Sequence, residues 1–486
     1  MRYSLDPSVR RIGEGRVLIG GSPLKLFGIT DRGAQLIDSI ERGEVVENSP
    51  AANALVNRLL DAGALHPDVV TSEFDADSSA SPSATQITLI VPAFDSSAAT
   101  LDRLVAQISL GTDPDIVAVI IVDDGSRPPI SEVTGATVVR RSTNGGPAAA
   151  RSTGLEHVAT PLVAFVDTDV ELAPNWLRPL LAHFADPRVA LVAPRVASVE
   201  GTTVLARYEM LHSPLDLGSV PARVRAGTRV SYVPTAAVVC RVIALQDVGG
   251  FDDSMRVGED VDLAWRLDET GWRVRYEPAV TVTHRPRTSF ATWAKQRRDY
   301  GTSAAPLATR HPGSLAPVRV SGWSAATWFA IAAGWPIVGG VIAAVTTAML
   351  SRKLRNIPDG KREALRLAGL GHLFAGRSLA SALTRAWWPL ATIAALVSRR
   401  ARRAVLIAAI APATIDWIRL RPQVDPLRYI GLRLLDDMSY GIGLAHGAVQ
   451  ARSIQTYIPD FTSWPRAKST RGGISAHSNA PTTNRT

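Results

Sequence analysis

Two apolar segments that each end in a pair of acidic residues constrain the fold of this chain more than any other feature. The segments are 116–122 and 162–166, and a Gly-Gly-Pro turn at 145–147 opens an Ala-rich helix between them. The acidic residues that follow them are Asp123, Asp124, Asp167 and Asp169. Short continuous apolar runs are typical of buried strands, so the order predicts a β-α-β crossover. In an open α/β sheet, the carboxyl ends of such strands border the ligand crevice.

The neighbouring segments extend the same alternation of strands and helices. A strand at 87–91 and a helix at 101–110 precede the crossover, and strands at 230–239 and 280–283 follow it. This order predicts an α/β fold with a mostly parallel sheet. It would also suit a dehydrogenase, but no Gly-x-Gly-x-x-Gly turn follows the first strand, where a dinucleotide site needs one. The segment 195–227 is predicted to be irregular and to face an acceptor.

Each acidic pair on its own has an ordinary explanation. Asp, Gly and Ser form turns at strand ends, and an Asp-x-Asp sequence can cap a helix. Together the pairs favour a nucleotide-diphosphate donor and a divalent cation. Mg²⁺ or Mn²⁺ prefers carboxylate oxygens plus substrate phosphates, which assigns the metal and the donor diphosphate to Asp167 and Asp169. Asp123 and Asp124 accept hydrogen bonds and suit the N–H of a uracil or the hydroxyls of a ribose.

Three further residues are candidates for the same site. Arg151, on the helix after the Gly-Gly-Pro turn, can offer a planar cation to base or phosphate, although a solvated helix arginine is the ordinary alternative. Asp260 follows Glu259 at the start of a helix, whose positive end stabilises at least one of these acids. We interpret Asp260 as a general base that deprotonates an acceptor hydroxyl. His284, after the last strand, is a candidate contact to metal or diphosphate, although a lone histidine there is more often structural.

The first 66 residues predict a small winged-helix-like α+β module. A β-hairpin around the paired glycines at 20–21 precedes two short helices, the second opened by Ser49 and Pro50. DNA binding is disfavoured because neither helix carries a basic run. Peptide binding at a hairpin edge and simple bracing of the next domain both stay open. Residues 67–86 are rich in Ser, Asp, Ala, Thr and Pro, which predicts a flexible linker.

Four motifs within residues 86–300 resemble the family 2 glycosyltransferases, which have the GT-A fold. They are Val-Asp-Asp-Gly-Ser at 122–126, Asn-x-Gly-x-x-x-Ala-Arg at 144–151, Asp-Thr-Asp at 167–169 and Gly-Glu-Asp at 258–260. The resemblance implies a nucleotide sugar at the first Asp pair, a divalent metal at the Asp-x-Asp, and Asp260 as base with inversion at the anomeric carbon. Processive members carry Gln-x-x-Arg-Trp. This chain instead has Gln296, Arg297, Arg298, Asp299 and Tyr300, a departure that disfavours polymer synthesis.

The first module is similar to the peptide-recognition modules of the pyrroloquinoline-quinone chaperone family (PqqD-like). Its fusion to such a transferase and a membrane-type tail resembles the mycofactocin glycosyltransferases of actinobacteria. This resemblance implies a UDP-hexose donor, chiefly UDP-glucose, and a peptide-derived redox cofactor that receives β-linked glucose. The precursor peptide is a further expected partner. Two rivals remain: a membrane polysaccharide synthase or lipid-linked sugar transferase, and a non-catalytic peptide-binding scaffold.

The charge and the apolar runs of the last third indicate a membrane. The formal net charge is +9, and the arginines concentrate after residue 285 beside apolar runs, which suits a membrane better than nucleic acid. Residues 323–350 lack Asp, Glu, Lys, Arg and His, which predicts a transmembrane helix kinked near Pro336, with a buried core helix as the alternative. Both flanks are basic, so its orientation stays open. The shorter runs 386–397 and 404–415 predict re-entrant, interfacial or soluble helices.

Residues 301–460 are therefore predicted to form a helical, membrane-associated region, preceded by an amphipathic interfacial helix at 289–298. The residues 461–486 predict a disordered tail. A single cysteine, Cys240, rules out an intramolecular disulfide and suits a reducing compartment. No signal peptide is evident at the start. We expect the catalytic domain at the cytoplasmic face of the cell membrane.

Overall fold

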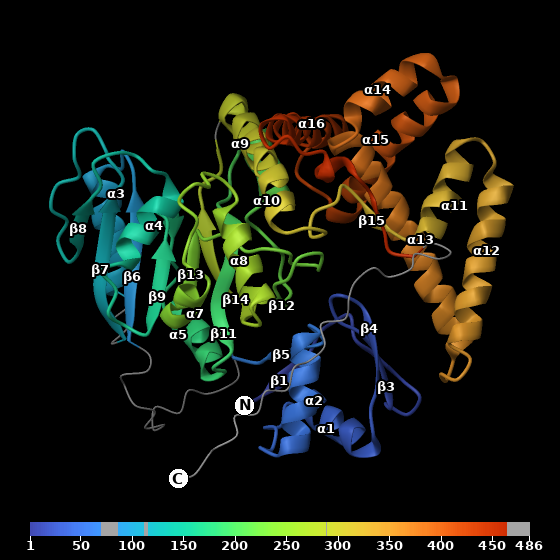
Figure 1. Cartoon of the computed structure of the whole chain (residues 1–486), viewed down its shortest axis with the longest axis horizontal. Coiled ribbons are helices and arrows are strands. Elements are labelled where there is room, and N and C mark those ends of the chain that lie inside the picture. The colour runs from blue at the N-terminus through green and yellow to red at the C-terminus, as the bar shows by residue number, and fades with distance from the viewer. Residues whose placement is uncertain (70–85, 111–114, 288, 464–486) are drawn as a thin grey trace, which may run out of the picture.

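A small α+β module forms the first part of the computed structural model, which describes residues 1–69, 86–110, 115–287 and 289–463 (Figure 1). Its elements are β1 (Tyr3–Leu5), β2 (Arg10–Ile12), β3 (Val17–Gly20), β4 (Lys25–Gly28), α1 (Asp31–Glu41), α2 (Pro50–Asp61) and β5 (Leu65–Pro67). Strands β2, β3 and β4 form one antiparallel sheet, and β1 pairs with β5. The side chains of Thr30 and Ser49 cap the two helices. The predicted hairpin and both predicted helices are thus present, whereas most of the predicted linker lies outside the described residues.

Ion pairs attach this module to the central sheet. Asp61 of α2 accepts hydrogen bonds from Arg223 at 2.6 Å and from Arg273 at 2.7 Å. Asp6 accepts from Arg229 at 2.9 Å and also contacts the buried ring of His66 at 2.9 Å. Because one partner of each pair is buried, breaking a contact would leave a poorly solvated charge. The module is therefore attached to the central sheet domain, which agrees with a bracing role, and peptide binding stays a prediction.

The central sheet is mixed rather than mostly parallel. Its strands are β6 (Ile87–Ala93), β7 (Ile116–Asp123), β8 (Thr137–Arg140), β9 (Leu162–Val166), β10 (Val170–Glu171), β11 (Val189–Ser198), β12 (Ala222–Arg223), β13 (Ala237–Arg241) and β14 (Arg273–His284). The order is β10-β14-β11-β13-β9-β6-β7-β8, and β12 pairs with β14. Strand β6 is parallel to β7 and β9, whereas β13 is antiparallel to β9 and β11. The α/β class is confirmed.

Helices cover both faces of the sheet. They are α3 (Ala98–Leu110), α4 (Pro147–Leu155), α5 (Leu177–Ala182), the short 3-10 helix η2 (His183–Ala185), α6 (Val204–His212), α7 (Val242–Asp247) and α8 (Glu259–Glu269). Alternate residues of β6 and β7 belong to two apolar clusters, one with α3 and α5, the other with α4, α7 and α8. This alternation follows from the period of two along a strand.

Two local predictions within this domain are wrong. The strand predicted at 230–239 begins only at Ala237, because Pro234 lacks the N–H that a central strand donates. The segment predicted to be irregular contains α6, whose first turn is capped by the side chain of Thr203. Both errors move boundaries without changing which strand ends carry the acidic residues.

The last part of the chain is helical and packs on the catalytic domain (Figure 1). Its elements are α9 (Phe290–Thr302), α10 (Ala304–Arg310), β15 (Arg319–Val320), α11 (Gly322–Ala332), α12 (Pro336–Lys353), α13 (Gly360–Arg385), α14 (Trp388–Val397), α15 (Arg399–Leu420), α16 (Pro426–Gln450), the short 3-10 helix η3 (Gln455–Tyr457) and β16 (Asp460–Phe461). The helical region is confirmed, and the predicted tail lies almost wholly outside the described residues.

The predicted transmembrane helix at 323–350 is wrong. The chain forms two helices that pack against each other, α11 and α12, with a turn at Gly334 between them. Gly334 has a φ of +90°, which a glycine adopts without strain, and Pro336 starts the second helix. The turn divides the apolar run. In the described part of the chain, no helix combines the length and the apolar character that a bilayer crossing requires.

The predicted interfacial helix at 289–298 is also placed differently. It is α9, whose Trp293 and Arg297 are buried against the catalytic domain and α16. Arg297 forms ion pairs with Glu209 of α6 and with Asp436 of α16, the latter at 3.0 Å. Helix α9 is therefore an internal support that joins the catalytic domain to the last helices.

The close contact between α9 and α16 depends on a glycine, and we expect Gly443→Ala to destabilise the protein. A Cβ atom at Gly443 would overlap the carbonyl oxygen of Arg298, so the helices must separate at a cost of about 3 kcal/mol. Gly431 lies in the same helix with nothing within 4 Å of an added Cβ, so Gly431→Ala should be neutral or stabilising by up to ~1 kcal/mol. Thermal unfolding of both variants checks this. Equal melting temperatures of the two variants would show that the close contact between α9 and α16 at Gly443 does not determine the stability of the protein.

Candidate active site

The predicted aspartates gather at one edge of the sheet, where β7 and β9 end. Strand β6 lies between them and is parallel to both, so the two carboxyl ends point to the same edge of the sheet, one strand apart. Asp123 is the last residue of β7, and Asp167 directly follows β9, with its N–H donating to the carbonyl of Ala236 at 2.8 Å. The crossover predicted from the apolar pattern thus places the acidic pairs as expected.

The carboxylates of Asp123 and Asp124 both accept hydrogen bonds from other groups of the chain. Asp123 is 0% exposed and accepts hydrogen bonds from the backbone N–H groups of Ser126 and Ile130 and from Arg140. Burial alone would raise the pKa of Asp123, but these hydrogen bonds and the charge of Arg140 lower it. The two residues therefore shape the loop after β7, and their predicted direct contact with a nucleotide stays a prediction.

Asp124 holds the Gly-Gly-Pro turn in the same way. It is 3% exposed and accepts from the N–H of Gly145 at 3.0 Å and of Gly146 at 2.8 Å. The guanidinium of Arg141 donates to it at 2.8 Å. Since Gly146 has a φ of +91°, the turn needs glycine there. Asp124 thus fixes the start of α4 and, with it, the position of Arg151.

Arg151 lies at the centre of the site rather than at its surface. One guanidinium nitrogen donates to Asp167 at 2.8 Å and another to Glu259 at 2.9 Å. The side chain is buried, and its guanidinium lies 5.6 Å from the ring centroid of Phe251. Two of its guanidinium nitrogens thus bind carboxylates, and the predicted contact of Arg151 with base or phosphate stays a prediction. Sequence reasoning assigned Glu259 no role in the site. Through Arg151, Glu259 of α8 is linked to Asp167 at the end of β9.

Asp260 is half-buried beside Glu259 at the first turn of α8. Burial, and then the negative charge of Glu259, raise its pKa to about 7. The preceding Gly258 has a φ of +84°, and a Cβ there would lie 2.8 Å from the Cβ of Ser303, so only glycine suits this entry to the helix. A carboxylate that titrates near neutral pH and keeps some solvent contact meets the requirements of a general base.

Two tyrosines from separate segments, Tyr232 and Tyr300, lie within electrostatic reach of Asp260. Burial, and then the charge of Asp260, raise the pKa of Tyr232, and the same two causes raise the pKa of Tyr300 to about 12. Tyr440 of α16 contributes more weakly to the shift at Tyr232. Tyr440 is thus linked to this group only through Tyr232. Sequence reasoning missed Tyr232 and Tyr440, which no motif marks.

Asp169 and His284 contact each other, and the predicted contact of His284 with metal or diphosphate stays a prediction. Strand β10 pairs with β14 so that Val170 lies opposite His284, and the ring Nε2 of His284 lies 2.9 Å from a carboxylate oxygen of Asp169. Burial alone would raise the pKa of Asp169, but the hydrogen bond with His284 lowers it. The histidine therefore holds this carboxylate in its ionised form.

The residues at this edge fit a divalent cation only in combination with a substrate. Among the residues that the structure describes, no three His, Cys, Asp or Glu side chains are grouped to hold a metal, so His284 does not complete a protein cage. Asp167 and Asp169 nevertheless offer two carboxylates, one of them half exposed. Mg²⁺ and Mn²⁺ are commonly bound by one or two carboxylates plus substrate phosphates, a set that this edge can supply.

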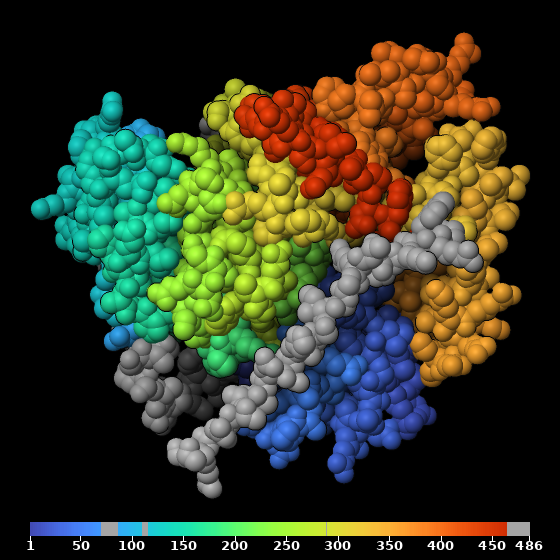
Figure 2. All heavy atoms as spheres, viewed as in Figure 1, coloured from blue at the N-terminus to red at the C-terminus, as the bar shows by residue number. Residues whose placement is uncertain are grey.

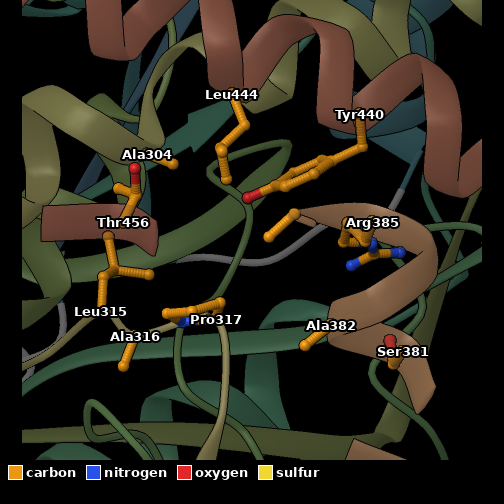
Figure 3. A pocket seen from close by; sticks show the side chains of 11 residues that line it. Ala304, Leu315, Ala316, Pro317, Ser381, Ala382, Arg385, Tyr440, Leu444 and Thr456 are labelled. Atoms are coloured by element: carbon orange, nitrogen blue, oxygen red, sulfur yellow. The ribbon is translucent and has the colours of Figure 1, made fainter. Parts of the chain in front are cut away.

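A cavity of about 170 Å³ lies in the helical region, away from the predicted carboxylates (Figure 3). Tyr440 and Leu444 of α16 line one side, and Leu315 and Pro317 line another. The guanidinium of Arg385 stacks at 4.7 Å from the ring centroid of Tyr440. None of the residues that line the cavity is one of the predicted site residues.

Comparison with known proteins adds three findings. Residues 88–246 match the model of glycosyl transferase family 2. The chain is 41% identical to the pre-mycofactocin glycosyltransferase of Mycobacterium tuberculosis over an alignment of 474 residues. This alignment covers 94% of this chain and 97% of that relative. It is similar to the mannosyltransferase PcManGT of Pyrobaculum calidifontis, solved with GDP-Man and Mn²⁺, at 17% identity and a TM-score of 0.41 over 74% of this chain and 87% of that one. A likeness at that level supports no further conclusion.

Proposed function

The chain belongs to glycosyl transferase family 2 and is a glycosyltransferase, and we propose that it transfers glucose from UDP-glucose to a peptide-derived redox cofactor of the mycofactocin type. The observation that carries this proposal is the 41% identity to the M. tuberculosis pre-mycofactocin glycosyltransferase, which extends over 97% of that relative. Because the chain is a glycosyltransferase, the alternative of a non-catalytic peptide-binding scaffold no longer applies. The geometry of the carboxylates supports the chemistry that follows.

We infer an inverting displacement with Asp260 as base. As the acceptor hydroxyl oxygen forms a bond to the anomeric carbon of the sugar, Asp260 takes the hydroxyl proton. The bond from the anomeric carbon to the diphosphate oxygen breaks, and its electron pair leaves with UDP. Attack from the face opposite the leaving group inverts the configuration and yields a β-linked product from an α-linked donor. A base whose pKa is about 7 is well matched to this step at neutral pH.

The donor diphosphate would lie at the carboxyl ends of β7 and β9. A divalent metal held there by Asp167 and Asp169 would neutralise the charge of the leaving diphosphate. Arg151 and His284 orient these two carboxylates through the hydrogen bonds at 2.8 and 2.9 Å. The loop that Asp123 and Asp124 shape would receive the nucleotide.

The acceptor would lie on the other side of Asp260, among Tyr232, Tyr300 and Tyr440. Aromatic side chains offer apolar faces to a ring-containing acceptor and hydroxyls to its polar groups. Tyr300 stands where processive relatives carry tryptophan, and it accepts a hydrogen bond from Gln296 at 3.1 Å. This supports transfer to a small acceptor, with polysaccharide synthesis or transfer to a lipid-linked sugar as the rival activity.

The proposal is tested by turnover of UDP-glucose with Mg²⁺ or Mn²⁺ and a peptide-derived acceptor. We expect UDP release to depend on the acceptor, and nuclear magnetic resonance of the product to report a β linkage. GDP-mannose and a lipid extract are the comparison donor and acceptor. Transfer to the lipid extract alone, or a ladder of polymer on a gel, would favour the rival activity instead.

Asp169→Ala is expected to weaken metal-dependent UDP binding by at least about tenfold, because one of the two proposed metal carboxylates is removed. Glu171→Ala is the matched control, since Glu171 lies two residues away and pairs only with the exposed Arg285 at 2.8 Å. Calorimetric titration of UDP with and without Mn²⁺ measures both variants. If Asp169→Ala keeps the affinity of the wild type in Mn²⁺, the metal assignment is wrong.

Two further proposals concern where the enzyme works and which peptide it binds. We propose that it works at the cytoplasmic face of the cell membrane, since its cysteine, Cys240, is a free, buried thiol and its helical region exposes many apolar side chains.

We further propose that the first module recognises the precursor peptide. Strand β4 is an edge of its sheet and carries the half-exposed Leu26, an arrangement that can accept an added peptide strand.

A further inference from the structure

We infer that the protein docks on an anionic bilayer surface through the tips of two helical hairpins, without crossing the bilayer. This inference rests on the proposed membrane location and specifies how the contact is made. The first hairpin is formed by α11 and α12, and the second by α14 and α15. Three observations carry it: the position of the two turns, the apolar side chains they expose, and the distribution of charge along the chain.

The two turns lie next to each other at one corner of the molecule. A Cβ atom added at Gly334, in the first turn, would be 3.8 Å from the guanidinium Nε of Arg400, at the start of α15. Figure 1 shows both turns at the upper right, far from the sheet, and in Figure 2 the second hairpin projects from the surface. Hairpins that are remote from each other in sequence thus present one combined surface.

Large apolar side chains are exposed on this surface. We define the hairpin tips by Trp335, Ile337, Leu396 and Val397, which are 57%, 82%, 76% and 84% exposed. Further large apolar side chains of the same four helices are exposed, at Phe329, Val341, Leu390, Ile393, Leu406 and Ile407. Isolated exposed apolar residues are ordinary, but a contiguous patch of this kind marks an interaction surface.

The positive charge of the chain is concentrated in the same region. Residues 322–415 contain 12 Lys and Arg against 2 Asp and Glu, so the rest of the chain has 41 basic and 42 acidic residues. The whole formal charge of +9 therefore comes from this region. Four exposed arginines follow Leu396 and Val397 of the second tip in the sequence: Arg399, Arg400, Arg402 and Arg403. No Asp or Glu occurs between residues 364 and 415, and Asp416 already pairs with Arg377 at 2.6 Å.

This combination of groups selects a lipid surface as the occupant. Arginines that border apolar side chains complement a bilayer interface, where phosphate headgroups lie above acyl chains. A nucleic acid would use the arginines and leave the apolar side chains in water. The helix α14 has 10 residues, about 15 Å at helical rise, which is half of the hydrocarbon thickness and suits shallow insertion.

The test is co-sedimentation of the full-length protein with vesicles of neutral phosphatidylcholine, or of phosphatidylcholine with about one third phosphatidylglycerol. We expect binding to the anionic vesicles that weakens as salt is raised. A variant with Arg399, Arg400, Arg402 and Arg403 all replaced by Gln should lose at least about a hundredfold in apparent affinity. A second variant, Leu396→Ser with Val397→Ser, should lose at least about tenfold even at low salt.

The control variant removes four charges at the opposite end of α12, by changing Lys353, Arg355, Lys361 and Arg362 to Gln. These side chains are exposed but lie at the turn whose Pro358 contacts the first module at Gly13. We expect this variant to bind anionic vesicles within about threefold of the wild type. All variants should keep the wild-type rate of UDP-glucose turnover with a water-soluble acceptor, which separates a failure of docking from a failure of the proposed activity. Binding that is absent, equal on neutral vesicles, or reduced equally in the control would overturn the inference.

Discussion

Asp260→Asn is expected to lower kcat by a factor of about 10² to 10⁴, the range for removing a general base. Asn has nearly the same shape as Asp and can accept the hydrogen bond that the N–H of Val261 donates at 2.8 Å, so the start of α8 should persist. The amide cannot take the proton of the acceptor hydroxyl. Steady-state turnover of UDP-glucose measures the effect, and calorimetry should show UDP affinity close to that of the wild type.

The pH dependence of the wild type gives an independent view of the same residue. Because the pKa of Asp260 is raised to about 7, the carboxyl is increasingly protonated below that pH and loses its capacity to accept a proton. The value of kcat/KM should therefore fall as pH is lowered through about 7, by about tenfold per unit. In Asp260→Asn this acidic limb should disappear.

Asp253 supplies the matched control for both measurements. It lies seven residues before Asp260, is exposed, and hydrogen-bonds Ser152 at 2.7 Å. Asp253→Asn should retain the turnover and the acidic limb of the wild type. Full activity of Asp260→Asn, or an acidic limb that survives in it, would refute the assignment of the base.

The parts of the fold that were predictable are those that local pattern determines. The acidic strand ends follow from two short apolar runs, and the start of α2 follows from Ser49 and Pro50. The antiparallel insertion of β13 between β9 and β11 depends on pairings between distant segments, which periodicity does not encode. The α/β class could thus be read from the sequence, but the mixed sheet could not.

The error at residues 323–350 has a different origin. Hydropathy alone favoured one long helix, although Gly334 and Pro336 are two residues apart, a spacing that suits a helix end followed by a helix start. Gly334 and Pro336 therefore indicated a hairpin, but the apolar composition of residues 323–350 favoured a single long helix. Composition correctly marked the region as unusual but gave the wrong geometry.

Within the site, the carboxylates could be named from motifs but their partners could not. The sequence predicted Arg151 as a planar cation for base or phosphate and indicated neither of its carboxylate partners. One of them, Glu259, is 108 residues away and meets Arg151 because α4 and α8 pack on the same face of the sheet. Such a contact follows from tertiary packing, which a single sequence does not reveal.

Arg151→Leu is expected to destabilise the protein by about 3 to 5 kcal/mol, the cost of leaving buried charges without their partner. Burial already raises the pKa of Asp167 and of Glu259, although the charge of Arg151 works against that rise. Without the guanidinium, both carboxylates would face each other unpaired. Arg151→Lys keeps the charge but cannot bridge two carboxylates with a planar fork, so its loss should be intermediate. Guanidinium-induced unfolding measures all three proteins.

Arg195→Leu is the control that separates burial from ion pairing as such. Arg195 also binds a carboxylate through two nitrogens, Asp216 at 2.9 and 2.7 Å, but is one third exposed, so its removal should cost at most about 1 kcal/mol. The deficit of Arg151→Leu should also shrink as pH falls, because protonation removes the uncompensated charges of Asp167 and Glu259. Equal losses in the two leucine variants, or a deficit independent of pH, would mean that Arg151 is not the residue that compensates the charges of the buried Glu259 and the partly exposed Asp167.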